Sequence, residues 1–120
     1  MSDSNQARIR AFLKTEYCNA QSGADSGNTE EAWRHLERAH IVAQGMLVPH
    51  IYSHWQMLRL AVRTSDVREI LGQLARLALA PLGNLTGRLP IGNTGRSDVS
   101  AFVHMDIPAD LQSILKDQIK

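Results

Sequence analysis

The stretch HLERAHIVAQGMLVPHIYSHWQML, residues 35–58, decides how this chain folds. Four of the chain's five histidines lie in it: His35, His40, His50 and His54. Pro49 divides the stretch, because a proline has no backbone N–H and is best accommodated at the first position of a helix. The stretch therefore predicts two helices joined by a short link at residues 47 and 48. Helices joined so closely are expected to be antiparallel neighbours.

The first of these helices is predicted to run from Thr29 to about residue 44 or 46. The Thr29 hydroxyl can cap free N–H groups of the first turn, and the acidic residues 30 and 31 suit the positive end of the helix dipole. An apolar stripe recurs along it at spacings of three and four: Ala32, Leu36, Ala39, Ala43 and Met46. The second helix is predicted from Pro49 to Arg63. It carries His50 and His54, four residues apart, on its buried face.

Folding the two predicted helices against each other brings three histidines close together. His40 falls opposite residue 55, next to His54, and Gln44 falls opposite residue 51, next to His50. The three rings are then expected within one or two helical turns, each about 5.4 Å long. With Glu37, three residues before His40, they resemble part of a metal site in a helical bundle, and imidazole suits zinc, copper, iron or nickel. The alternative is a buried polar seam, in which Glu37, Gln44, a backbone carbonyl or water satisfies the histidines.

The composition of the whole chain limits its class. Its 120 residues, of which 43% are hydrophobic and 21% charged, are typical of one soluble globular domain. The net charge of +1 gives no field that attracts nucleic acid or a membrane surface. The single cysteine, Cys18, excludes an intramolecular disulfide and a cysteine-rich zinc site. No apolar run of membrane-spanning length and no signal peptide is found, so a cytoplasmic protein is expected.

Two further helices are predicted on either side of the central pair. One spans about residues 4–21, and the other runs from Asp66 to Ala80, where Pro81 ends or kinks it. A wide apolar face marks the second of these: Val67, Ile70, Leu71, Leu74, Leu77 and Ala78. A polar stripe lies beside it: Glu69, Gln73 and Arg76. Folding about residue 65 brings this stripe towards the histidines as ligands or supporting groups, and the alternative is an ordinary solvated helix face.

The last third of the chain begins with turn-forming residues. LPIGNTGR, residues 89–96, predicts a compact structural loop packed on the helices: Pro90, Gly92, Asn93, Thr94 and Gly95. An extended arm and a short helix starting at Pro108 follow. The expected fold is an all-α, compact antiparallel bundle of about four helices, with a Gly-rich loop or arm at about residues 84–107 and a short C-terminal helix. It forms a single domain over residues 1–120, with residues 1–4 flexible.

Two resemblances follow from these motifs. The predicted helix pair, residues 29–45 and 49–63, resembles one tetratricopeptide-type unit, but no second copy follows at the repeat period. Five segments together resemble a family of small bacterial proteins of unknown function: LERAH (36–40), PHIYSHWQML (49–58), REILGQLARL (68–77), GRLPIGNTGRSDVSAF (87–102) and MDIPADL (105–111).

The second resemblance covers residues 30–112. It implies a compact helical cytoplasmic protein, in a family often found among heavy-metal-resistance and mobile-element genes, and it brings no biochemical activity. The family pattern falls on one set of positions in this chain: His40, Gln44, His50, His54, Glu69, Gln73 and the loop of residues 90–95.

The main functional hypothesis is a non-enzymatic accessory protein that binds a transition metal such as zinc, copper or nickel. Its ligands would be His40, His50 and His54, completed by Glu37 or Glu69. Gln44, Gln73 and Arg76 would form a polar seam around these ligands. The alternative is a protein-interaction module with structural histidines, which presents Trp33, Trp55 and the Gly-rich loop to a partner, or which forms a homodimer. An enzyme is less favoured, because a di-iron centre needs about four carboxylates and only Glu37 and Glu69 are available.

Overall fold

Five helices form the part of the chain, residues 3–115, that the computed structural model describes. In chain order they are α1 (Asp3–Asp25), α2 (Thr29–Ala43), α3 (Leu47–Arg63), α4 (Val67–Thr86) and α5 (Ala109–Leu115). The described residues contain no strand. This confirms the predicted all-α bundle with a short C-terminal helix. Of the expected flexible start, residues 1 and 2 lie outside the described part.

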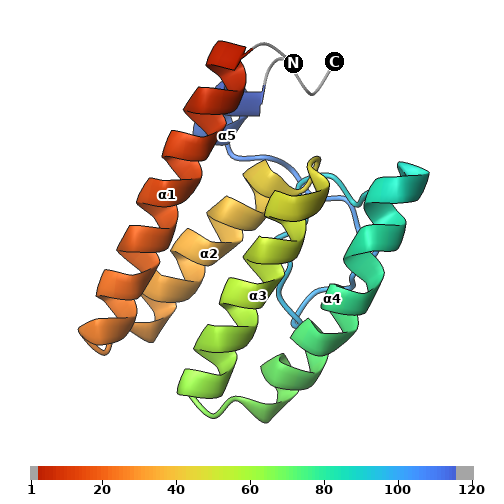
Figure 1. The fold of residues 1–120 in the computed structure, drawn as a ribbon. Coiled ribbons are helices and arrows are strands. Elements are labelled where there is room, and N and C mark those ends of the chain that lie inside the picture. Colours follow the sequence, from red (N-terminus) through yellow and green to blue (C-terminus); the bar gives the residue numbers. More distant parts are fainter. Residues whose placement is uncertain (1–2, 116–120) are drawn as a thin grey trace.

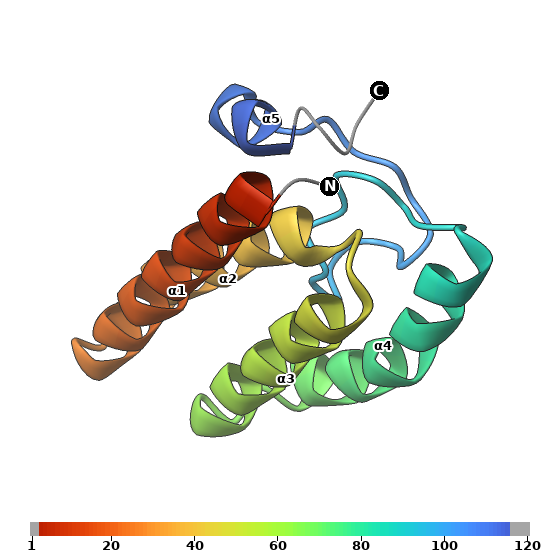
Figure 2. The same ribbon diagram turned by 45° about the horizontal axis from the view of Figure 1, so that its top comes forward.

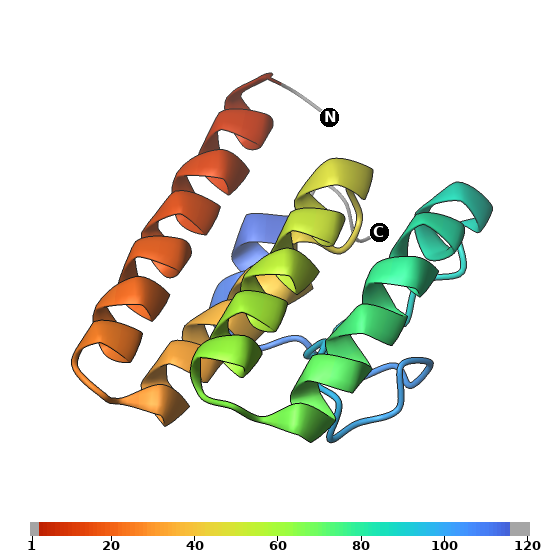
Figure 3. The same cartoon turned by 60° about the horizontal axis from the view of Figure 1, so that its bottom comes forward.

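Successive helices pack as antiparallel neighbours (Figure 1). α1 pairs with α2, α2 with α3, and α3 with α4, while α5 covers one end of the α1–α2 pair (Figure 2). The segment of residues 87–108 then returns from the end of α4 across the helices to α5 (Figure 3). No described helix has the length and apolar character needed to cross a membrane. This topology leaves α2 in the middle, in contact with α1, α3 and α5.

Capping and proline residues set the ends of the two central helices, and these ends lie within a few residues of the predicted ends. The cap of α2 is Asn28, whose Oδ1 accepts from the Glu31 backbone N–H at 3.2 Å, so Thr29 is the first helical residue instead of the cap. α3 begins at Leu47, two residues before the predicted start. Pro49 therefore lies within the first turn, where its missing N–H removes no intrahelical hydrogen bond.

The apolar core consists of two clusters that share α2. The first joins α1, the end of α2 and α5: Ile9, Leu13, Ala39, Ile41, Val42, Ala43, Leu111 and Leu115. The second joins the other half of α1 to α2 and α3: Ala20, Ala32, Trp33, Leu36, Met57, Leu60 and Ala61. Neither cluster includes a buried residue of α4. Polar contacts of Glu69 and Gln73 with the loop and with His54 hold that helix instead.

α4 is longer than predicted, and of the two predicted alternatives its polar stripe takes the one that faces inward. It continues through Pro81 to Thr86 and ends where Gly87 adopts a left-handed conformation with φ of +73°. Its apolar residues Val67 and Leu71 are 65% and 64% exposed, whereas Glu69 and Gln73 are buried. The inward side is therefore the polar stripe. The reason is that the segment of residues 87–108 lies against this side and supplies partners for the polar groups.

Two glycines let that segment approach other groups closely. Gly92 has φ of +81°, and a Cβ atom there would lie 1.9 Å from the backbone oxygen of Met105. Gly95 has φ of +84°, and a Cβ atom there would lie 2.8 Å from the His40 ring. Only glycine adopts these conformations without strain while leaving the required space. The Gly-rich loop is thus folded on itself and pressed against α2.

Candidate metal centre

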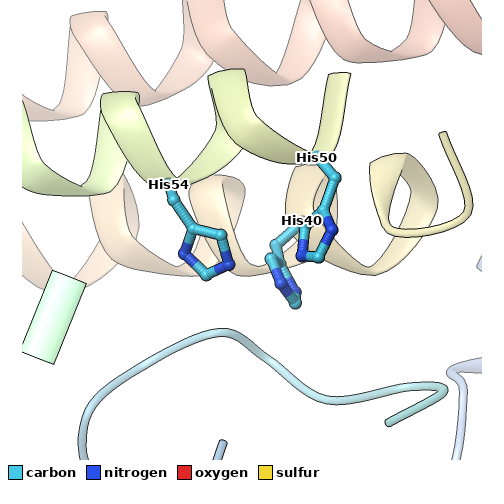
Figure 4. Close-up of side chains that lie close together, drawn as sticks. All are labelled: His40, His50 and His54. Carbon is cyan, nitrogen blue, oxygen red and sulfur yellow. The ribbon is translucent and has the colours of Figure 1, made fainter. Parts of the chain in front are cut away.

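Three buried imidazole rings meet where α2 and α3 face the loop. His40 comes from α2, and His50 and His54 come from successive turns of α3 (Figure 4). None of the three residues is more than 5% exposed. The ring centroids are 4.6 Å apart for His40 and His54, and 5.1 Å apart for each of the other pairs. One potential ligand nitrogen from each residue lies within 4.8 Å of those of the others, so the predicted proximity is confirmed.

The loop fixes the orientation of the His40 ring. Nδ1 of His40 lies 2.7 Å from the backbone carbonyl oxygen of Asn93. A carbonyl oxygen can only accept, so Nδ1 carries the proton and donates. The Asn93 side chain in turn holds the loop, donating to the carbonyl oxygens of Ser100 and Val103 at 2.8 and 2.9 Å. The neutral His40 ring therefore carries its lone pair on Nε2.

A side-chain amide of α4 fixes His50 in the same way. Nδ1 of His50 lies 2.7 Å from Oδ1 of Asn84. The amide cannot be turned around, because its Nδ2 donates to the backbone carbonyl of Gln44 at 3.0 Å. The oxygen of Asn84 must then face the imidazole and accept from Nδ1. The lone pair of the neutral His50 ring is again on Nε2.

A second amide of α4 fixes His54. Nδ1 of His54 lies 2.8 Å from Oε1 of Gln73. Nε2 of Gln73 donates to Oε2 of Glu69 at 2.9 Å and to the backbone carbonyl of Gly95 at 2.8 Å, and both of these oxygens are acceptors. Gln73 therefore presents its oxygen to His54, and all three rings share one tautomer. A fixed acceptor on the outer ring nitrogen is the arrangement that orients metal-binding histidines in proteins.

Burial also keeps the three rings neutral. It lowers the pKa of His54 to about 4, and it holds the pKa of His40 well below its usual value of 6.5, where the neighbouring histidines add to the effect. The pKa of His50 is lowered for the same reason, although the hydrogen bond to Asn84 opposes the shift. The rings are thus in their metal-binding form at neutral pH.

The two carboxylates predicted as ligands lie elsewhere. The group of potential metal ligands among the described residues contains neither Glu37 nor Glu69. Both instead bind Arg96 of the loop, whose Nε is 2.7 Å from Glu69 and whose guanidinium is 3.2 Å from Glu37. Burial would raise the pKa of Glu69, but hydrogen bonds from Arg96, Gln73 and the Ser97 backbone outweigh it and lower the pKa. Glu69 therefore remains a charged acceptor behind Gln73.

The loop is anchored on both sides of the histidines. On one side, Gln44 donates to the Pro90 carbonyl at 2.9 Å. On the other, the guanidinium of Arg96 lies 3.8 Å from the ring centroid of Trp33, which is buried. Trp33 is therefore not available to a partner as predicted, whereas Trp55 is half exposed.

Sequence reasoning missed two residues of this site, Asn84 and Arg96. A signal for Asn84 exists, because residues eleven apart on a helix lie three turns apart on the same face, and Asn84 follows Gln73 by that spacing. Arg96 has no such signal, since its contacts depend on the path of the loop.

A cavity of about 370 Å³ opens beside the three rings. Arg76 and Arg88 line it together with Gln44, Thr86 and Asn93. The rest of its wall is mostly apolar: Leu79, Ala80, Leu82, Leu89, Pro90, Ala101 and Phe102. A metal held by the histidines would therefore keep one side open to this cavity.

Comparison with curated proteins finds no match, and comparison with solved structures finds none either. A family model, in contrast, matches residues 7–115, which include the three histidines, their hydrogen-bond acceptors and the loop. The chain therefore belongs to the family described as protein of unknown function (DUF3703).

Proposed function

We propose that this protein binds one transition-metal ion through Nε2 of His40, His50 and His54. The observation that carries the proposal is the shared tautomer: each Nδ1 donates to a fixed oxygen, so that the lone pair of each ring is on Nε2, and the three buried rings lie together. No hydrogen bond within residues 3–115 uses these Nε2 atoms. A polar seam would pair them with donors, whereas a cation satisfies all three at once.

The donor set favours zinc and also suits copper or nickel. Zinc sites commonly use three protein ligands and leave a fourth position open. Tetrahedral zinc–nitrogen bonds of about 2.0–2.1 Å place the nitrogens roughly 3.4 Å apart. The ligand atoms here are within 4.8 Å of one another, so binding would draw the rings closer by small side-chain rotations. The open position would face the cavity, which fits an ion that exchanges or takes a further ligand.

The test is the amount of bound metal in protein purified without a polyhistidine tag. The wild-type chain is expected to carry about one equivalent of metal after incubation with zinc, copper or nickel and removal of the excess. His50→Ala/His54→Ala should lose it. His35→Ala is the control, because His35 is another histidine of the α2–α3 pair but lies outside the group of three and pairs with Glu16, with its Nδ1 2.5 Å from the carboxylate. A folded wild-type protein without metal would contradict the proposal.

One observation favours the alternative, a protein-interaction module. The outward side of α4 exposes apolar residues at spacings of three and four: Val67, Leu71, Leu74, Ala78, Leu82 and Leu85. Such a stripe is typical of a helix that packs against another helix. The matching test is the molar mass in solution of wild type and Leu71→Gln/Leu74→Gln. If both proteins are monomers and bind no metal, the stripe does not form a homodimer, and the partner is a different protein.

A further inference from the structure

The cavity beside the histidines is apolar and carries positive charge only. Its charged lining residues, among those that the structure describes, are Arg76 and Arg88, and no aspartate or glutamate lines it. The nearest buried carboxylates, Glu37 and Glu69, bind Arg96 instead. A divalent ion on three neutral imidazoles would add two further positive charges to this space. Charges of one sign that line one cavity attract an anion to it.

Arg76 is held in a way that leaves its charge uncompensated. Its guanidinium donates to the backbone carbonyls of Gly72 and Val99, at 3.2 and 2.7 Å. Its Nε–H is buried and has no hydrogen-bond partner among the described residues. No carboxylate of residues 3–115 lies within 4.0 Å of it. Burial lowers the pKa of Arg76, although the more distant Glu69 and Asp98 oppose the shift. Two carbonyls thus fix a cation that lacks an anion.

We propose that the cavity binds a small organic carboxylate, whose charged group takes the open position of the metal beside Arg76 and whose apolar body lies against Leu79, Leu82 and Leu89. The inference rests on the proposed metal site. The cavity volume of about 370 Å³ lies in the range of small-molecule pockets. A phosphate group fits less well, because two Arg76 N–H groups are already used by carbonyls and the remaining wall is mostly apolar.

The experiment uses cobalt(II) as the probe metal, because its visible absorption bands change when a ligand enters the coordination shell. Cobalt-loaded protein is titrated with benzoate, with acetate and with benzamide. Benzoate is expected to shift the bands and saturate. Acetate, which keeps the charge but lacks the ring, should bind roughly tenfold or more weakly, since it buries far less apolar surface. Benzamide, which keeps the shape but lacks the charge, should leave the bands unchanged.

Two variants test the role of Arg76. Arg76→Gln, loaded to the same cobalt content as the wild type, should bind benzoate roughly tenfold or more weakly, because it removes a charged hydrogen-bond donor beside the carboxylate. Arg76→Lys should recover part of that loss. Arg59→Gln, at an exposed position of α3 that does not line the cavity, is the control and should bind benzoate as the wild type does.

The possible results separate the two proposals. In one case the protein binds cobalt, but its absorption bands do not change with benzoate, or change equally with benzoate and benzamide. Either result would overturn the carboxylate inference but not the proposed metal site. Failure of the folded wild-type protein to bind cobalt would overturn the metal site and this inference with it.

Discussion

Gly95 passes so close to His40 that a Cβ atom at position 95 would lie 2.8 Å from two carbons of the imidazole ring. The same loop supplies the Asn93 carbonyl that accepts from Nδ1 of His40. The backbone of the loop therefore both covers this ring and sets its tautomer.

Gly95→Ala is expected to weaken metal binding as well as stability. The methyl group would push the loop from His40, and the residue would keep a left-handed conformation that costs about 1–3 kcal/mol when not glycine. Gly27→Ala is the matched control, because Gly27 has φ of +77° and open space around its Cβ position. Urea denaturation should show a lower free energy of unfolding in both variants. Metal titration should show an affinity lower by roughly tenfold or more only in Gly95→Ala. Equal metal affinity in the two would contradict the proposed contact.

Asn84→Ala should reduce metal affinity without unfolding the protein. It removes the oxygen that accepts from Nδ1 of His50, so the ring can turn and can place its proton on Nε2. Loss of such an orienting group commonly lowers metal affinity about 10–100-fold. Isothermal titration with zinc measures the change, and circular dichroism checks the helices. Arg68→Ala, at an exposed position of α4 that does not line the cavity, is the control, and an unaltered affinity in Asn84→Ala would show that Asn84 does not orient the ligand.

The metal-free protein should lose stability as the pH falls from about 6.5. The folded state lowers the pKa of His54 to about 4, while the unfolded chain titrates near 6.5. Below pH 6.5 the unfolded state therefore binds more protons, and stability decreases until the folded pKa is reached. For His54 alone the full change is about 3 kcal/mol.

Urea denaturation between pH 7 and about pH 5.5 measures this slope where most carboxylates stay charged. His54→Gln should have a shallower slope than the wild type, because it removes one of the contributing groups. The same slope in both proteins would mean that His54 keeps an ordinary pKa in the folded state.

Arg96→Met is expected to destabilise the protein by roughly 3–5 kcal/mol, because it leaves the buried Glu69 carboxylate without its cation. Adding Glu69→Gln should recover part of that loss, since the remaining amide carries no charge. The free energy of unfolding of the single and double variants gives the coupling. Additive losses would show that the Arg96–Glu69 ion pair does not hold the loop.

The three-histidine group could be predicted from the sequence because it depends on one hairpin. Once Pro49 places the break, helix geometry alone brings His40 beside His50 and His54. For α4 the sequence left two alternatives, a polar stripe turned towards the histidines or an ordinary solvated helix face. The choice between them could not be made from periodicity, because Glu69 is buried by Arg96, which lies 27 residues later and reaches back to it. A pattern within one helix carries no information on a partner that a distant loop supplies.

The order of the residues along the chain has a consequence for how the site is made. Each of the three histidines precedes its hydrogen-bond acceptor, by 53 positions for His40, 34 for His50 and 19 for His54. During synthesis the three imidazoles therefore leave the ribosome before any group that selects their tautomer. A metal captured by the nascent hairpin would meet rings that are free to turn. The site reaches its final geometry only when α4 and the loop have docked, so maturation of the centre waits for the last third of the chain.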